Sequence, residues 1–114
     1  MRARETYAQR WTDLLADASK DSLTFADFPW PIAAAQDRAE VAIDDLTVEA
    51  VSAFLFPENV ERKERLREAF LRFHPDKFEG RFMHRIQPSE VDKVRAGIGQ
   101  VSRVLKTIHD FRKE

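Results

Sequence analysis

A stripe of apolar residues near the C-terminal end constrains the fold more than any other feature. Valine, isoleucine or leucine recurs there at steps of three and four, at Val91, Val94, Ile98, Val101, Leu105 and Ile108. This spacing places the side chains on one face of an α-helix. Pro88-Ser89-Glu90 is an ordinary signal for a helix start. The sequence therefore predicts a long helix over residues 89–111 with a buried stripe.

Two shorter helices are predicted before it. One covers residues 60–73, where the apolar positions follow the spacing i, i+3, i+4, i+7, at Leu66, Ala69, Phe70 and Phe73. Pro75 ends this helix, because the residue before a proline is pushed out of the α-helical region, and a connection that contains Gly80 follows. The other covers residues 47–56, with Thr47 as its N-cap.

The first 46 residues combine a helix with an irregular aromatic segment. A helix over residues 3–18 is predicted from Tyr7, Trp11, Leu14, Leu15 and Ala18, and its start so near the first residue suits a longer helix trimmed from a larger protein. Pro29 and Pro31 flank Trp30 and exclude a continuous helix there, and residues 36–45 are mostly loop. The aromatic side chains, Phe25, Phe28 and Trp30, have two interpretations: a lid over the helical core, which we favour, or a Pro-rich strip that docks a partner.

Composition narrows the class of protein. The 114 residues, of which 43% are hydrophobic, suit one globular domain with one modest core. Without cysteine there is no disulfide or thiol chemistry, and the three histidines are too far apart to suggest a zinc site. No apolar run is long enough to span a bilayer, and the first residues lack the apolar segment of a secretion signal. We expect a nuclear or cytoplasmic protein with no metal, cofactor or membrane partner.

Charge is unevenly distributed along the chain. Ten acidic and two basic residues lie between Asp13 and Glu58, whereas fourteen basic and nine acidic residues follow from Asn59 on. The second half therefore favours an acidic partner. Nucleic acid is a weaker candidate, because Glu64, Glu68 and Glu79 interrupt any continuous basic stripe. The glycines of "AGIGQ" (96–100) follow no predicted strand, so they form no phosphate loop; inside a helix they permit a close approach or a kink. No nucleophile–base constellation can be assembled, and we expect no enzymatic activity.

The triplet His74-Pro75-Asp76 is the main functional candidate. Pro75 stiffens the chain, Asp76 can accept hydrogen bonds, and His74 offers both a donor and an acceptor. Such an exposed, charged turn suits contact with a partner, although a plain helix stop is the simpler interpretation. Basic residues of the preceding helix and the lysine after the triplet extend the candidate partner-binding set, which is His74, Pro75, Asp76, Lys77, Lys63 and Arg67.

From Thr47 onward the chain resembles a J-domain, the module of co-chaperones that stimulate heat-shock ATPases of the seventy-kilodalton class. The resemblance lies in a short first helix, a basic second helix, the "HPDK" loop and an amphipathic third helix. Because "RETYAQRWTDLL" and "LTFADFPWP" precede "FHPDKFEGRF", nearly the whole chain is similar to the C-terminal part of NF-kappa-B inhibitor-like proteins.

The resemblance implies an all-α fold, a J-domain-like antiparallel hairpin of the helices at 60–73 and 89–111 with an additional N-terminal helix. Residues 47–114 would form the J-like domain, and residues 1–46 would pack on it or lead into it. His74 and Asp76 would trigger ATP hydrolysis in the partner, while Lys63, Arg67 and Lys77 would steer the encounter.

Three functional hypotheses follow. The leading one is a co-chaperone that docks a heat-shock 70 class ATPase and stimulates its ATP hydrolysis. The alternative is a J-like protein-interaction scaffold in a nuclear regulatory or RNA-processing complex, without ATPase stimulation. The third, binding of nucleic acid through the positive second half, is the least favoured.

Overall fold

The structure, a computed structural model, describes residues 2–16, 21–36, 40–57 and 61–112. The α-helices in these segments are α1 (Arg2–Ala16), α2 (Ala33–Gln36), α3 (Val48–Leu55), α4 (Arg62–Phe73), α5 (Pro75–Phe82) and α6 (Val91–Arg112). Single turns of 3₁₀ helix form η1 (Phe25–Asp27), η2 (Ile43–Asp45), η3 (Met83–Arg85) and η4 (Pro88–Glu90). The described residues contain no strand beyond an isolated parallel bridge between Leu23 and Ile86. The prediction of an all-α fold is confirmed.

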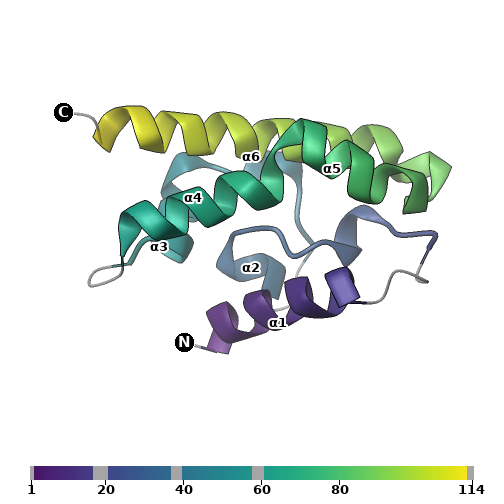
Figure 1. The fold of residues 1–114 in the computed structure, drawn as a ribbon, viewed down its shortest axis with the longest axis horizontal. Helices are drawn as coiled ribbons and strands as arrows, with labels where there is room; N and C mark the ends of the chain where they lie inside the picture. Colours follow the sequence, from purple (N-terminus) through teal and green to yellow (C-terminus); the bar gives the residue numbers. More distant parts are fainter. Residues whose placement is uncertain (1, 17–20, 37–39, 58–60, 113–114) are drawn as a thin grey trace.

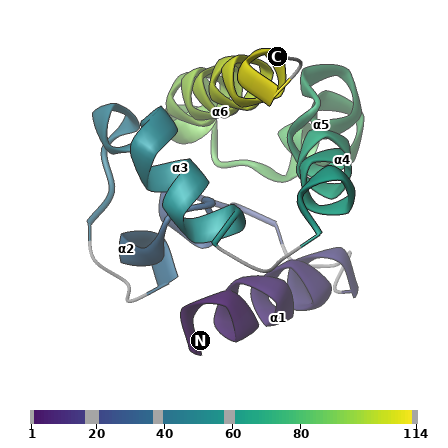
Figure 2. The ribbon, with the colours of Figure 1, turned by 90° about the vertical axis from the view of Figure 1, so that its left-hand side faces the viewer.

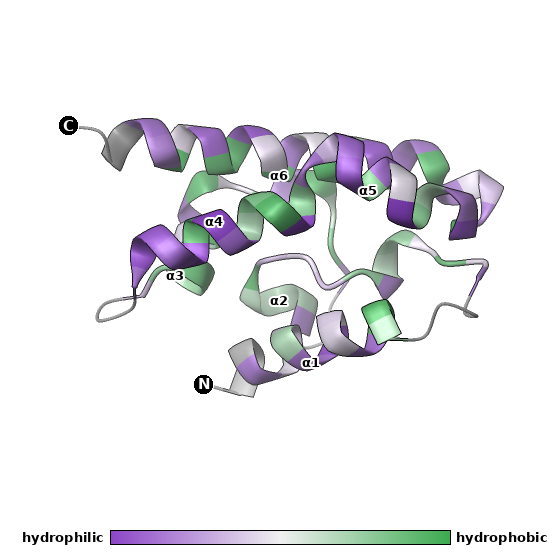
Figure 3. Cartoon of the chain, viewed as in Figure 1, coloured by the Kyte–Doolittle hydropathy of each residue, from purple (hydrophilic) through white to green (hydrophobic). Residues whose placement is uncertain are grey.

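Helices α4 and α6 lie side by side and run in opposite directions, with α5 continuing beyond the end of α4 (Figure 1). These are the helices predicted at 60–73 and 89–111. The apolar stripe of α6 is buried, since Val94, Val101 and Leu105 are fully covered. Hydrophilic and hydrophobic residues alternate along both ribbons in Figure 3, as expected of amphipathic helices.

Helix α3 packs against α6, and α1 lies on the opposite side of the molecule from α6 (Figure 2). Thr47 caps α3 as predicted, because its hydroxyl accepts a hydrogen bond from the backbone N–H of Ala50 at 3.1 Å. Helix α1 follows the predicted range up to Ala16, and Ala18 lies outside the described residues.

The segment after Pro75 differs from the prediction. A connection containing Gly80 was expected, but Pro75 is the first residue of α5. Proline suits this place, because its fixed φ is helical and the first turn needs no N–H donor. Phe78 and Phe82 then lie one turn apart, 1% and 2% exposed. The burial of these two rings makes the segment a helix, so the proline that ends α4 also starts α5.

The aromatic segment before α2 fills the space between the helices. Phe28 packs against Phe78 and Phe82, with ring centroids 5.1 and 5.6 Å apart. Trp30 stacks on Phe25 at 4.5 Å, and its indole N–H donates to the Phe25 carbonyl oxygen at 2.8 Å. All three aromatic side chains of the segment are buried. They form part of the core, so the docking-strip interpretation of these side chains is wrong.

Gly97 of α6 lies directly against this aromatic segment. A Cβ atom at Gly97 would be 2.7 Å from Trp30 Cη2 and 2.9 Å from Phe25 Cε2. At Gly99 a Cβ would meet only the Arg103 guanidinium at 3.5 Å, an ordinary contact. The close approach expected of these glycines is therefore made by Gly97 and not by Gly99.

Candidate protein-interaction surface

The His-Pro-Asp triplet forms the junction between α4 and α5. His74 is the last cap of α4 and the first cap of α5, with φ −69° and ψ 122°. All three residues of the triplet are exposed, whereas the flanking Phe73 and Phe78 are each 1% exposed. Two buried rings therefore hold an exposed turn in place from both sides.

A groove of about 560 Å³ lies beside this turn, along one face of α4 and the C-terminal part of α6. Four of the six predicted partner-binding residues line it, namely Lys63, Arg67, His74 and Lys77. Helical spacing explains why they gather, since positions 63, 67 and 70 follow one another at steps of four and three. Pro75 and Asp76 do not line the groove, although both are exposed beside it.

The floor of the groove is apolar. Leu66 is buried, Phe70 is partly buried, and Leu71 is 46% exposed. The ring of His109 on α6 meets the Phe70 ring edge to face, with centroids 6.3 Å apart. Leu71 and His109 were not predicted from the sequence as site residues. The available signal for Leu71 was an apolar side chain outside the core-facing stripe of its helix.

The rim of the groove is positively charged. Among the described residues that line it, the polar ones are lysine, arginine and histidine, and none is acidic. Arg67 approaches Glu64 at 3.4 Å, but these side chains are 74% and 55% exposed. Solvent screens such a pair strongly, so Arg67 remains able to meet an incoming carboxylate.

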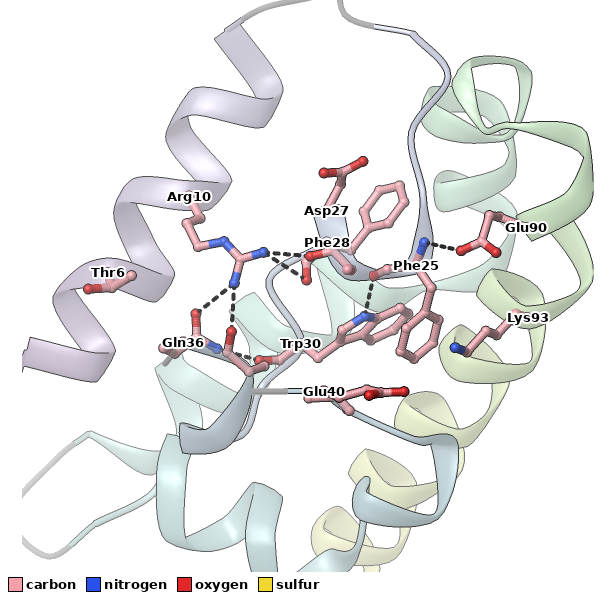
Figure 4. A pocket seen from close by; sticks show the side chains of 13 residues that line it. Thr6, Arg10, Phe25, Asp27, Phe28, Trp30, Gln36, Glu40, Glu90 and Lys93 are labelled. Atoms are coloured by element: carbon pink, nitrogen blue, oxygen red, sulfur yellow. Dashed lines mark hydrogen bonds between the residues drawn. The ribbon is translucent and has the colours of Figure 1, made fainter. Parts of the chain in front are cut away.

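A second hollow, of about 750 Å³, lies between α1, the aromatic segment and the start of α6 (Figure 4). Arg10 reaches into it and donates to the carbonyl oxygens of Ala26, Phe28 and Ala35 at 3.0 to 3.3 Å. The Glu90 carboxylate accepts from the backbone N–H of Phe25 at 2.9 Å. Arg10 and Glu90 thus connect the aromatic segment to α1 and to the start of α6. Because its polar side chains make these internal hydrogen bonds, we assign the hollow a structural role.

Two further features of the described segments bear on function. No three His, Asp or Glu side chains gather there in a way that could hold a metal ion. No helix in the same segments combines the length and the apolar character needed to cross a membrane.

The groove and the turn together form a surface suited to binding another macromolecule, with an apolar floor, a cationic rim and a rigid edge. Comparisons of the chain with protein-family models, with curated proteins and with solved structures found no match.

Proposed function

We propose that this chain is a J-domain-like adaptor that docks a heat-shock 70 class ATPase through its His-Pro-Asp turn and stimulates ATP hydrolysis. The observation that supports the proposal is the exposure of the triplet on a turn held by buried Phe73 and Phe78. The motif resemblance to J-domains and to NF-kappa-B inhibitor-like proteins supplies the class of partner. A nuclear or cytoplasmic ATPase of this class is the corresponding partner.

The physical basis of the docking is preorganisation. A turn fixed by two buried rings loses little conformational entropy when a partner closes around it. Lys63, Arg67 and Lys77 lie on the same surface and accelerate the encounter with an acidic face of the partner. In this scheme the hydrolytic chemistry belongs to the ATPase, and the adaptor shifts its conformational equilibrium by binding one state more tightly.

Single-turnover ATP hydrolysis by a heat-shock 70 class ATPase tests the proposal. We expect the native chain to raise the rate and the His74→Gln variant to lose most of that effect. His84→Gln is the matched control, because His84 is exposed on η3 and does not line the groove. The proposal fails if the folded native chain leaves the rate unchanged, or if the two variants behave alike.

A second candidate function, a scaffold without ATPase stimulation, is favoured by one observation. Pro75 starts a helix whose Phe78 and Phe82 rings pack on Phe28, so the triplet also has an architectural use. On this hypothesis His74→Gln and Asp76→Asn leave partner binding intact, whereas disruption of α5 abolishes it. Pull-down of nuclear regulatory or RNA-processing proteins with these variants separates the two functions.

A further inference from the structure

We propose that the groove between α4 and α6 binds an acidic peptide segment that carries bulky apolar side chains and belongs to a partner protein. This inference does not depend on the identity of the ATPase, because it rests on the lining of the groove, to which the triplet contributes only His74.

The apolar floor provides the first argument. Within the described side chains, two large hydrophobic ones are strongly exposed, Leu15 at 47% and Leu71 at 46%. Leu71 differs from Leu15 because it lines a hollow together with Leu66 and Phe70. The hollow has a volume of about 560 Å³ and is open to solvent, so it can seat side chains of a partner without enclosing a whole ligand. Apolar side chains of a partner are the groups that gain most from entering it.

The positive charge of the rim indicates that the bound peptide also carries acidic residues. Lys63, Arg67 and Lys77 supply three permanent positive charges, and the side chains of His74 and His109 add hydrogen-bond donors to the lining. No carboxylate that would repel an acidic ligand is found among the lining residues that the structure describes. Aspartate and glutamate placed beside the apolar anchors of a peptide would meet these cations and fix its register.

A protein segment fits the groove better than a nucleic acid does. Unspecific binding of single-stranded nucleic acid uses aromatic side chains as stacking platforms along a continuous positive track. Here the most exposed floor residue is the aliphatic Leu71, and the exposed carboxylates of Glu64 and Asp76 lie next to the rim. These carboxylates interrupt the continuous positive track that a chain of phosphates needs. A short peptide needs only separate cations for its separate acidic residues.

The probe for this inference is a displayed library of random 16-residue peptides selected against the whole 114-residue chain. We expect the selected peptides to be enriched in Asp and Glu and in Leu, Phe or Trp, and to bind more weakly as salt is added. Fluorescence anisotropy should show that Leu71→Asp weakens their binding at least about tenfold. Leu15→Asp should leave it unchanged, because Leu15 is equally exposed on α1 but lies outside the groove.

A second variant tests the charge separately from the apolar floor. Arg67→Glu, on a side chain that is 74% exposed, should weaken the same peptides by a similar factor without disturbing the fold. Selection of basic peptides, equal losses with Leu71→Asp and Leu15→Asp, or no binder at all would overturn the proposal. So would a 20-nucleotide single-stranded RNA that displaces the peptides and binds Leu71→Asp as well as the native chain. A failure of ATPase stimulation alone would leave these binding results unchanged.

Discussion

Replacement of Gly97 by alanine tests the packing of the core most directly. In a helix interior alanine is favoured over glycine by about 1 kcal/mol, so helix propensity alone predicts a more stable protein. The new Cβ atom would lie 2.7 Å from Trp30 Cη2, however, a distance that real Cβ contacts do not show. Trp30 has little freedom to withdraw, because it stacks on Phe25 and its indole N–H is hydrogen-bonded to the Phe25 carbonyl oxygen.

Gly99→Ala supplies the matched control, because Gly99 lies in the same helix two residues further on. Both substitutions gain the same propensity, whereas only Gly97→Ala forces atoms into a filled core. Overpacking of this kind typically costs about 1–3 kcal/mol. We expect Gly99→Ala to stabilise the protein by up to about 1 kcal/mol. Gly97→Ala should be less stable than Gly99→Ala by about 1–3 kcal/mol.

Urea unfolding followed by tryptophan fluorescence measures this difference, since Trp11 and Trp30 are each 1% exposed in the folded chain. The slope of the free energy against urea should be the same for both variants, because the surface exposed on unfolding barely changes. If Gly97→Ala proves as stable as Gly99→Ala, Trp30 does not pack on α6 as described. Near-ultraviolet circular dichroism would then report whether the indole has moved.

Three further perturbations test separate parts of the fold. Burial raises the pKa of Tyr7, the single tyrosine, above its ordinary value of 10.0, so ultraviolet titration should show its phenolate forming at higher pH than in free tyrosine. The stability that neutral Tyr7 provides is present below pH 10 and is lost as pH rises through the raised pKa. The Tyr7→Phe variant should not show this loss. The hydrogen bond from Arg95 lowers the pKa of Glu79 below its ordinary value of 4.5. The ion pair therefore stabilises the fold above about pH 4.5 and ceases to do so as pH falls through the lowered pKa. Urea unfolding should show that Glu79→Gln is less stable than the native chain at neutral pH, and the difference should vanish in acid. Removal of the Thr47 cap by Thr47→Ala should cost about 1 kcal/mol, and an unchanged urea midpoint would show that the cap contributes nothing.

The elements that the sequence predicted well are those defined by local patterns. Helix α6 was found from its apolar stripe, and the N-cap of α3 was found from Thr47, because both signals lie within one element. Helix α5 was missed because a proline is compatible with two different local structures. It ends the helix before it and also suits the first turn of a new one. The spacing of Phe78 and Phe82 was the signal that distinguished the two cases.

The candidate site was only partly predictable for a related reason. Lys63 and Arg67 share a face of α4, so helical spacing alone brings them together, whereas His74 is the cap that follows the helix. The groove itself needs α6 beside α4, which places His109 next to Phe70. Similarly, the close approach of Gly97 to Trp30 depends on tertiary packing that no local pattern contains.

The bridge between Leu23 and Ile86 joins distant parts of the chain, and this affects the rate at which the chain folds. The backbone N–H of Leu23 donates to the Arg85 carbonyl oxygen at 2.8 Å, and the Leu23 carbonyl oxygen accepts from the N–H of Gln87 at the same distance. The hydrogen bond from Phe25 to Glu90 joins groups 65 residues apart. Long loops must therefore close before these contacts can form, which raises the contact order above that of a bundle of sequential helices. We expect the helices to form early and the docking of the aromatic segment to limit the folding rate, so this small all-α chain should fold more slowly than its helix content suggests.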